Sequence, residues 1–250
     1  MTLRKYVVAL LVAGACLAPA GVASAAFPNF TGCPTSAPGF ELCVNVQAVR
    51  GNLNIKGFDV PLGESLEIRG AISREETFLP ATGTNGFIAR PVAVPGGLLG
   101  IEWIPGNSVL AITELAGSPS AVRFDTGRLG LSVPVKVRLV NTLLGMNCHI
   151  GTNANPVRLN LITGTTSPPP PNRPISGSIP VERFVPPNQI QGIGVVNVEN
   201  SFAVPGATEC GLGLGLINAL VNLKLGLPSA AGNNSISVTN NIAITLGAPH

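Results

Sequence analysis

Histidine and cysteine, the residues best suited to nucleophilic, redox or metal chemistry, are scarce in this chain. The sequence holds five cysteines and two histidines, His149 and His250. A catalytic triad would have to use His149, because His250 is the last residue given and is expected to be mobile. The sequence contains no Gly-x-Ser-x-Gly elbow and no Cys-x-x-Cys pair. We therefore expect His149 to be a loop residue, and we expect no histidine-based metal site.

Paired carboxylates could hydrolyse glycosides. Glu75 and Glu76 form the only adjacent acidic pair, and a solvated turn explains them better. The separated acids Glu102, Glu114 and Asp125 could still meet in space. Aromatic residues are only 4% of the chain, so stacking platforms for sugars are lacking. A hydrolase without a recognisable motif is therefore the least favoured function.

Glycine and asparagine clusters do not supply a phosphate or cation site. Gly211, Gly213 and Gly215 lack both the lysine and the spacing of a phosphate-binding loop. Calcium loops need clustered acids, and these asparagines are neutral, so we expect them to build turns. The asparagines are Asn153, Asn155, Asn233 and Asn234. We expect no catalytic residue, no cofactor and no metal ligand.

Four cysteines, Cys33, Cys43, Cys148 and Cys210, remain if the leader described below is removed. An even number of cysteines in an exported chain predicts two disulfides, and four cysteines allow three connectivities. We favour Cys33–Cys43, which closes a short loop rich in proline and glycine. The remaining bridge, Cys148–Cys210, closes a longer loop and joins two segments expected to be ordered.

The first 25 residues have the pattern of a cleavable secretory signal peptide. Arg4 and Lys5 precede an apolar run at 6–17, and small residues lead to a cleavage site after Ala25. The run is too short to cross a bilayer. An uncleaved anchor and a lipoprotein cut before Cys16 are the alternatives. We expect a protein that is secreted or held in the cell envelope.

The nearly neutral charge balance gives the protein no electrostatic reason to bind nucleic acid. Removing Arg4 and Lys5 from fifteen basic residues leaves thirteen against twelve acidic ones, so we expect no nucleic-acid partner. Charged residues make up 11% of the chain, well below the usual share, while glycine and proline are abundant. This composition is typical of a turn-rich β protein outside the cell.

Alternation of apolar and polar residues predicts a mainly antiparallel all-β fold, a sandwich or a barrel-like sheet. We expect Pro134 to mark an edge strand or a bulge. In residues 212–227 the spacing of the apolar residues fits both a helix and a strand, and we favour one short helix near 214–225. The expected strands are 44–48, 52–56, 66–69, 108–115, 131–140, 157–161, 195–204 and 235–246.

A proline-rich segment at 165–174 divides the chain. Its sequence, TTSPPPPNRP, favours an extended polyproline course, either as a spacer or as a crossover within one domain. We favour the crossover, because the Cys148–Cys210 bridge would join both sides of it. We thus expect one disulfide-stapled β domain at 26–250. If that pairing is wrong, two subdomains at 26–164 and 175–250 become more probable.

Five features in the C-terminal part, namely Cys148 and the segments 151–153, 156–166, 167–177 and 226–234, resemble a group of uncharacterised exported actinobacterial proteins. The resemblance runs from Cys148 onward. It implies export and the pairing of Cys148 with Cys210, and it implies no activity.

Taken together, these observations favour an exported, non-catalytic β protein of the envelope or the extracellular space, with a structural, assembly or binding role. The alternative is lipid-facing: an outer-membrane β-barrel or a protein that binds an apolar ligand. A mean hydropathy of +0.41 favours that alternative, while short strands and few aromatics disfavour the barrel. The partners considered are envelope components or a second copy of the chain, and membrane contact is not favoured.

Overall fold

The computed structural model describes residues 27–246 except positions 74, 76, 84–85, 99, 101–104, 126–127, 180–181 and 212–214; at 120–125, 128–129 and 246 it describes the backbone alone. The expected signal peptide at 1–25 lies outside the described residues, with Cys16 and His250. So do Glu76, Glu102 and Gly213, together with the side chain of Asp125.

Two long antiparallel strands, β1 (Phe40–Ile55) and β15 (Asn234–Leu246), form the centre of the sheet. Apolar and polar residues alternate along both strands, so one face of each is apolar and the other polar. β1 includes the short strand expected at 44–48 and, except for Lys56, the one expected at 52–56. The chain does not turn between them, because a bulge between Ala48 and Arg50 absorbs the change in register.

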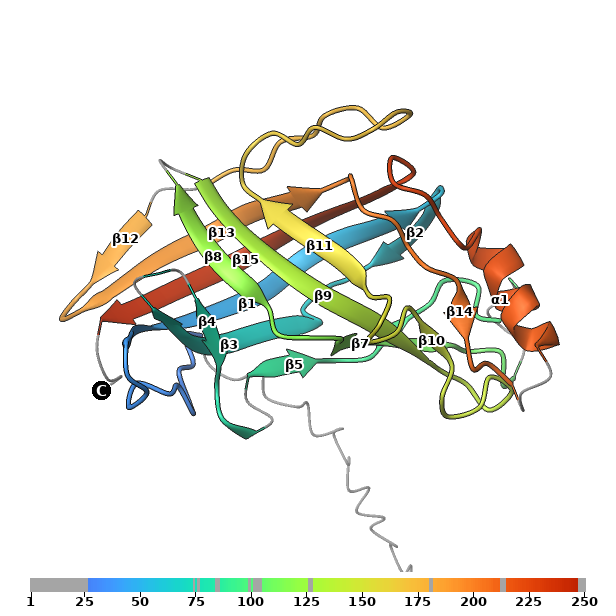
Figure 1. The fold of residues 1–250 in the computed structure, drawn as a ribbon, viewed down its shortest axis with the longest axis horizontal. Helices are drawn as coiled ribbons and strands as arrows, with labels where there is room; N and C mark the ends of the chain where they lie inside the picture. Colours follow the sequence, from blue (N-terminus) through green and yellow to red (C-terminus); the bar gives the residue numbers. More distant parts are fainter. Residues whose placement is uncertain are drawn as a thin grey trace, which may run out of the picture.

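All strands belong to one antiparallel sheet that curls into a half-barrel (Figure 1). The main path runs β14 (Ala207–Thr208), β10 (His149–Ile150), β9 (Arg128–Val140), β11 (Val157–Ile162), β13 (Gln189–Glu199), β15, β1, β3 (Leu66–Ser73) and β4 (Phe78–Pro80). Beside it, β2 (Phe58–Pro61) pairs with β1, β5 (Phe87–Ala89) with β3, β12 (Glu182–Val185) with β13, β7 (Leu110–Leu115) and β8 (Ser120–Asp125) with β9, and β6 (Val92–Ala93) with β7. The all-β antiparallel prediction is confirmed, in its barrel-like form.

Two bulges on either side of β15 contribute to the curl. One lies in β1 between Ala48 and Arg50, and the other in β13 between Ile193 and Val195. Both face the same stretch of β15, around Asn240. A bulge adds one residue to one strand and increases the local bend and twist. The curl brings β5 into contact with β7, so the two ends of the sheet approach each other.

Pro134 lies inside the sheet, which corrects the expectation of an edge strand. β9 is paired on both sides: Pro134 faces Arg158 of β11 on one side. On the other side β7 ends at Leu115 and β8 begins at Ser120. The N–H of Ala116 donates to the carbonyl of Pro134 across this gap (3.0 Å). The sheet therefore needs no donor from Pro134, because the neighbouring strand is interrupted beside the proline nitrogen.

The strand expected at 195–204 is displaced towards the N-terminus, since β13 spans Gln189–Glu199. Its start is extended by the hairpin with β12, in which Val185 pairs with Gln189. Its end is set by Asn200, whose Nδ2 donates to the carbonyl of Arg173 at 2.8 Å. Residues 200–204 therefore leave the sheet, although most of them are buried.

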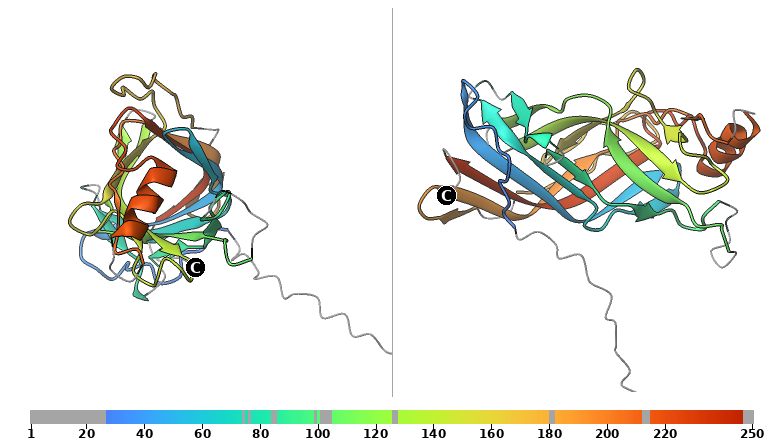
Figure 2. Two further views of the ribbon diagram at one scale, coloured as in Figure 1. Left: turned by 90° about the vertical axis from the view of Figure 1, so that its right-hand side faces the viewer. Right: turned by 90° about the horizontal axis from the view of Figure 1, so that it is seen from below.

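The expected helix is confirmed as α1 (Leu216–Leu225), which lies across one end of the curled sheet (Figure 2). Gly226, at φ 65°, ends it in the left-handed conformation that favours glycine. Val221 and Leu225 are buried one turn apart, which is the helical spacing. No helix in the described part of the chain is long and apolar enough to span a bilayer.

Two disulfides brace the sheet, and they join the pairs favoured from the sequence. Cys33–Cys43 has an S–S distance of 2.02 Å and ties residues 27–39 to β1. Cys148–Cys210 ties the start of β10 to the segment before α1. The proline-rich segment connects β11 to β12, and Asn172 Nδ2 donates to the carbonyls of Asn200 (2.9 Å) and Asn234 (2.8 Å).

Candidate functional site: an apolar cavity inside the curled sheet

The concave face of the half-barrel encloses a cavity of about 160 Å³. Successive residues of a strand point to opposite faces, so every second residue of each strand faces inward. On β9 the inward residues are Leu131, Val133, Val135, Val137 and Leu139, and all five line the cavity. β1, β3, β11 and β15 contribute further valine, leucine and isoleucine side chains.

The lining of the cavity is elongated. Its lining on β9 extends from Leu131 to Leu139, eight residues apart, or about 27 Å at about 3.4 Å per residue along the strand. The lining thus follows most of one strand, and the cavity is called the slot below. The shape suits a single extended chain better than a compact ring system.

The helix α1 closes one end of the slot. Leu225 lines the cavity together with Phe202 and Val204. Lys224 Nζ donates to the carbonyls of Gly96 (3.3 Å) and Gly97, which joins the helix to the loop after β6. Partial burial holds the pKa of Lys224 below its ordinary value. The helix is thus fixed by packing on the cavity side and by these bonds at the rim.

The lining contains three polar residues, Thr113, Asn197 and Asn240, and no charged residue among those described. Asn240 Nδ2 donates to Asn197 Oδ1 at 2.8 Å. The two asparagines are 6% and 4% exposed, so this pair of amides is buried inside an otherwise apolar wall. The cavity can therefore hold an uncharged, mostly hydrocarbon molecule, whereas a charged group would be buried there without a counter-ion.

The convex face has the opposite character. On β15 the residues between the inward ones are Ser235, Ser237, Thr239 and Asn241, all at least partly exposed. On β9 they include Lys136 and Arg138. The strands are therefore apolar towards the cavity and mostly polar on the outside, where Leu110 and Ile193 are exposed exceptions.

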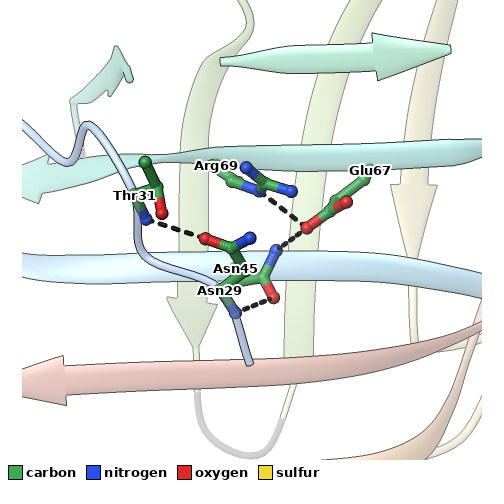
Figure 3. A network of polar contacts seen from close by, with 5 residues as sticks. All are labelled: Asn29, Thr31, Asn45, Glu67 and Arg69. Carbon is green, nitrogen blue, oxygen red and sulfur yellow. Dashed lines mark hydrogen bonds and ion pairs between the residues drawn. The ribbon is translucent and has the colours of Figure 1, made fainter. Parts of the chain in front are cut away.

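A buried polar cluster lies on the convex face, beneath residues 27–39 (Figure 3). Glu67 Oε1 accepts from Arg69 Nε (2.7 Å) and from Asn45 Nδ2 (2.8 Å). Asn45 Oδ1 in turn accepts from the N–H of Asn29 at 2.9 Å. The charge of Glu67 is compensated, and the cluster attaches the N-terminal segment to β1 and β3. It serves the fold rather than chemistry.

Of the candidate catalytic residues, the structure brings Glu114 and His149 together on the convex face. His149 Nε2 lies 3.5 Å from Glu114 Oε2, and its Nδ1 lies 2.7 Å from the carbonyl of Asn147. Both ring nitrogens are engaged, so neither is available to a hydroxyl nucleophile. His149 lies in β10 and not in a loop, because the segment after Cys148 pairs with both β9 and β14.

Glu114 is held by cations. Burial would raise the pKa of Glu114, but the hydrogen bond and charge of Arg138, with His149 and Lys136, outweigh it and lower the pKa. Arg138 Nε donates to Glu114 Oε1 at 2.7 Å. A carboxyl group that stays ionised in this way is a poor general acid.

The other expected site residues are dispersed. Glu75 is exposed in the turn after β3, as expected. The four cysteines are in disulfides. In the described part of the chain, no three histidine, cysteine or acidic side chains cluster as metal ligands would. Asn155 belongs to a turn with Thr152, whereas Asn234 is buried and donates to the carbonyl of Phe202 at 2.9 Å.

Sequence reasoning considered an apolar-ligand site but did not identify the residues that line it or its two asparagines. The signal was present: in β15 the inward series reads Ile236, Val238, Asn240, Ile242, and one polar residue interrupts an apolar row. In β13 Asn197 follows Val195 in the same way. A polar residue in the apolar half of an alternating strand indicates either a buried partner or a ligand.

Comparison with known protein families, with curated proteins and with solved structures finds no match for this chain.

Proposed function

We propose that this protein is an exported binding protein that carries a linear, uncharged apolar molecule inside its curled sheet. The observation that carries the proposal is the elongated cavity lined by valine, leucine and isoleucine from both halves of the sheet. Sites for small molecules are concave and mostly apolar, with few polar groups that fix orientation. This proposal takes up the apolar-ligand alternative from the sequence, which was not the favoured expectation there.

The distribution of polarity favours this role over insertion in a membrane. A lipid-facing sheet presents apolar side chains outward, whereas here serine, threonine, asparagine, lysine and arginine side chains occupy the convex face. The apolar side chains of the long strands mostly line the cavity instead.

Export is the second part of the proposal. The two disulfides fit an oxidising compartment outside the cytoplasm. The signal pattern of residues 1–25, with cleavage after Ala25, would deliver the chain there. N-terminal sequencing of the protein recovered from its producing cells tests the cleavage. An N-terminus that retains Arg4 and Lys5 would contradict it.

The binding role is tested with residues 26–250, prepared with both disulfides formed. Titration with N-phenyl-1-naphthylamine should give a saturable rise in fluorescence at one site per chain. Organic extraction of protein purified from its native source, followed by mass spectrometry, should recover a stoichiometric apolar molecule.

A matched pair of variants locates the site. Val135→Phe places a larger side chain in the cavity and should abolish the fluorescence change, because Val135 lines the slot. Val140→Phe makes the same change further along β9, at a partly exposed position outside the lining, and should leave binding intact. Equal effects of the two substitutions, or no saturable binding by the unmodified protein, would overturn the proposal.

A further inference from the structure

The amide pair inside the cavity has unused hydrogen-bonding capacity. Asn240 Nδ2 donates to Asn197 Oδ1 at 2.8 Å and also lies 3.5 Å from the carbonyl of Val238. One bond between two amides leaves one NH₂ group and one oxygen, whichever way the two side chains are oriented. Among the described residues, neither the Asn197 NH₂ group nor the Asn240 oxygen has another partner.

These two groups belong to a largely apolar wall. Both asparagines line the cavity, and both are more than nine-tenths buried. On β15, Val238 and Ile242 flank Asn240 on the same inward face, and both also line the cavity. Buried polar groups are almost always hydrogen-bonded, so a donor and an acceptor left over in such a wall indicate a ligand that bonds to them.

The chemistry of the pair favours an uncharged ligand group that both donates and accepts hydrogen bonds, and a hydroxyl is the smallest such group. A carbonyl or ether oxygen can accept from Asn197 but cannot donate to Asn240. A carboxylate or an ammonium group would be buried without a counter-ion, since no described lining residue is charged. A hydroxyl group both donates one hydrogen bond and accepts others, so it can engage both amides at once.

We propose that the ligand of this cavity is a linear hydrocarbon that bears a hydroxyl group, and that Asn197 and Asn240 bind that hydroxyl. This inference rests on the proposed binding function. Asn197 donates to the hydroxyl oxygen, and the Asn240 oxygen accepts the hydroxyl proton. The apolar lining takes up the hydrocarbon on either side of the pair.

The test measures selectivity by displacement of N-phenyl-1-naphthylamine. The competitors are 1-decanol, its methyl ether, 1-chlorodecane and decanoate at pH 8. Each is titrated into the unmodified protein and into the double variant Asn197→Leu, Asn240→Leu. For each protein we take the ratio of the dissociation constants of 1-decanol and 1-chlorodecane. The two competitors leave water with different free energies, and this difference cancels when the ratio is compared between the two proteins.

We expect the preference for 1-decanol over 1-chlorodecane to fall about tenfold in the double variant, which corresponds to two modest neutral hydrogen bonds. The methyl ether should bind the unmodified protein more weakly than the alcohol does. Unchanged selectivity in the double variant, or tighter binding of decanoate than of decanol, would overturn the hydroxyl assignment.

The outcomes separate the two proposals. If no competitor and no probe binds the unmodified protein, the binding function itself fails. If all competitors bind but the two proteins rank them alike, the function stands and the assignment of Asn197 and Asn240 fails. If the double variant does not fold, the single variants Asn197→Leu and Asn240→Leu are compared with the unmodified protein in the same way, and unchanged selectivity in both would overturn the assignment.

Discussion

Removing the two disulfides one at a time should destabilise the protein unequally. Cys33–Cys43 closes a loop of 10 residues and Cys148–Cys210 one of 62, so the loop-entropy relation gives about 2.7 and about 4.3 kcal/mol respectively at 25 °C. Cys33→Ala with Cys43→Ala should therefore cost about 1.6 kcal/mol less than Cys148→Ala with Cys210→Ala. Alanine is chosen because three of these cysteines are fully buried and a serine would bury a hydroxyl.

Equilibrium unfolding in urea, followed by both far-ultraviolet circular dichroism and size-exclusion elution volume, measures the free energy of unfolding. Coincident transitions justify a two-state treatment. Equal losses in the two double variants, or a larger loss on removing Cys33–Cys43, would refute the reasoning from loop length.

The same two variants should differ in ligand binding. Cys148–Cys210 joins β10 to the segment before α1, and the N–H of Gly211 donates to the carbonyl of Leu144 beside it (2.7 Å). Without this bridge α1 is held less firmly over the end of the slot, so the affinity for N-phenyl-1-naphthylamine should fall. Cys33–Cys43 lies on the convex side, and its removal should leave the affinity unchanged.

Three further substitutions test the electrostatic and backbone interpretations. Glu114→Gln should lower the free energy of unfolding by about 0.5–1 kcal/mol at pH 7. Because the folded-state pKa of Glu114 is lowered, its contribution is present above the unfolded pKa and is lost as the pH falls through the folded pKa, so thermal melts of the two proteins should converge at low pH. Arg69→Met leaves the Glu67 carboxylate buried without its cation and should cost about 3–5 kcal/mol in urea unfolding, with part of that loss recovered on adding Glu67→Gln. Gly226→Ala should cost about 1–2 kcal/mol in the same assay, because Gly226 has φ 65° and its new Cβ would lie 3.0 Å from Lys56 Cδ.

The long strands and the helix were predictable because their side chains repeat regularly. The alternation of Leu131 to Val140 and of Ser235 to Leu246 identifies β9 and β15 without any tertiary information. Strands such as β6 and β10, of two residues each, carry no period at all. They exist only because neighbouring strands supply their hydrogen bonds, so no local pattern could indicate them.

Pro134 and Asn240 show where the sequence signal was present but ambiguous. A proline within a strand indicates a missing donor, but whether the gap is a sheet edge or an interrupted neighbour depends on where β7 ends. Asn240 marks a polar position on an apolar face. Its partner Asn197 lies on another strand, and the diagonal contact depends on the bulged register between β13 and β15. The meeting of Glu114 with His149 depends likewise on pairing across three strands.

The position of β15 between β1 and β13 also determines when the molecule can fold. Until β15 has been synthesised, one long edge of β1 and one of β13 have no partner, and the cavity lacks the wall that holds Asn240. Contacts between segments so distant in the chain form late and slowly. Under the proposal that the chain is exported and binds a ligand, the slot would be enclosed only after β15 has crossed the membrane, so ligand loading would follow export.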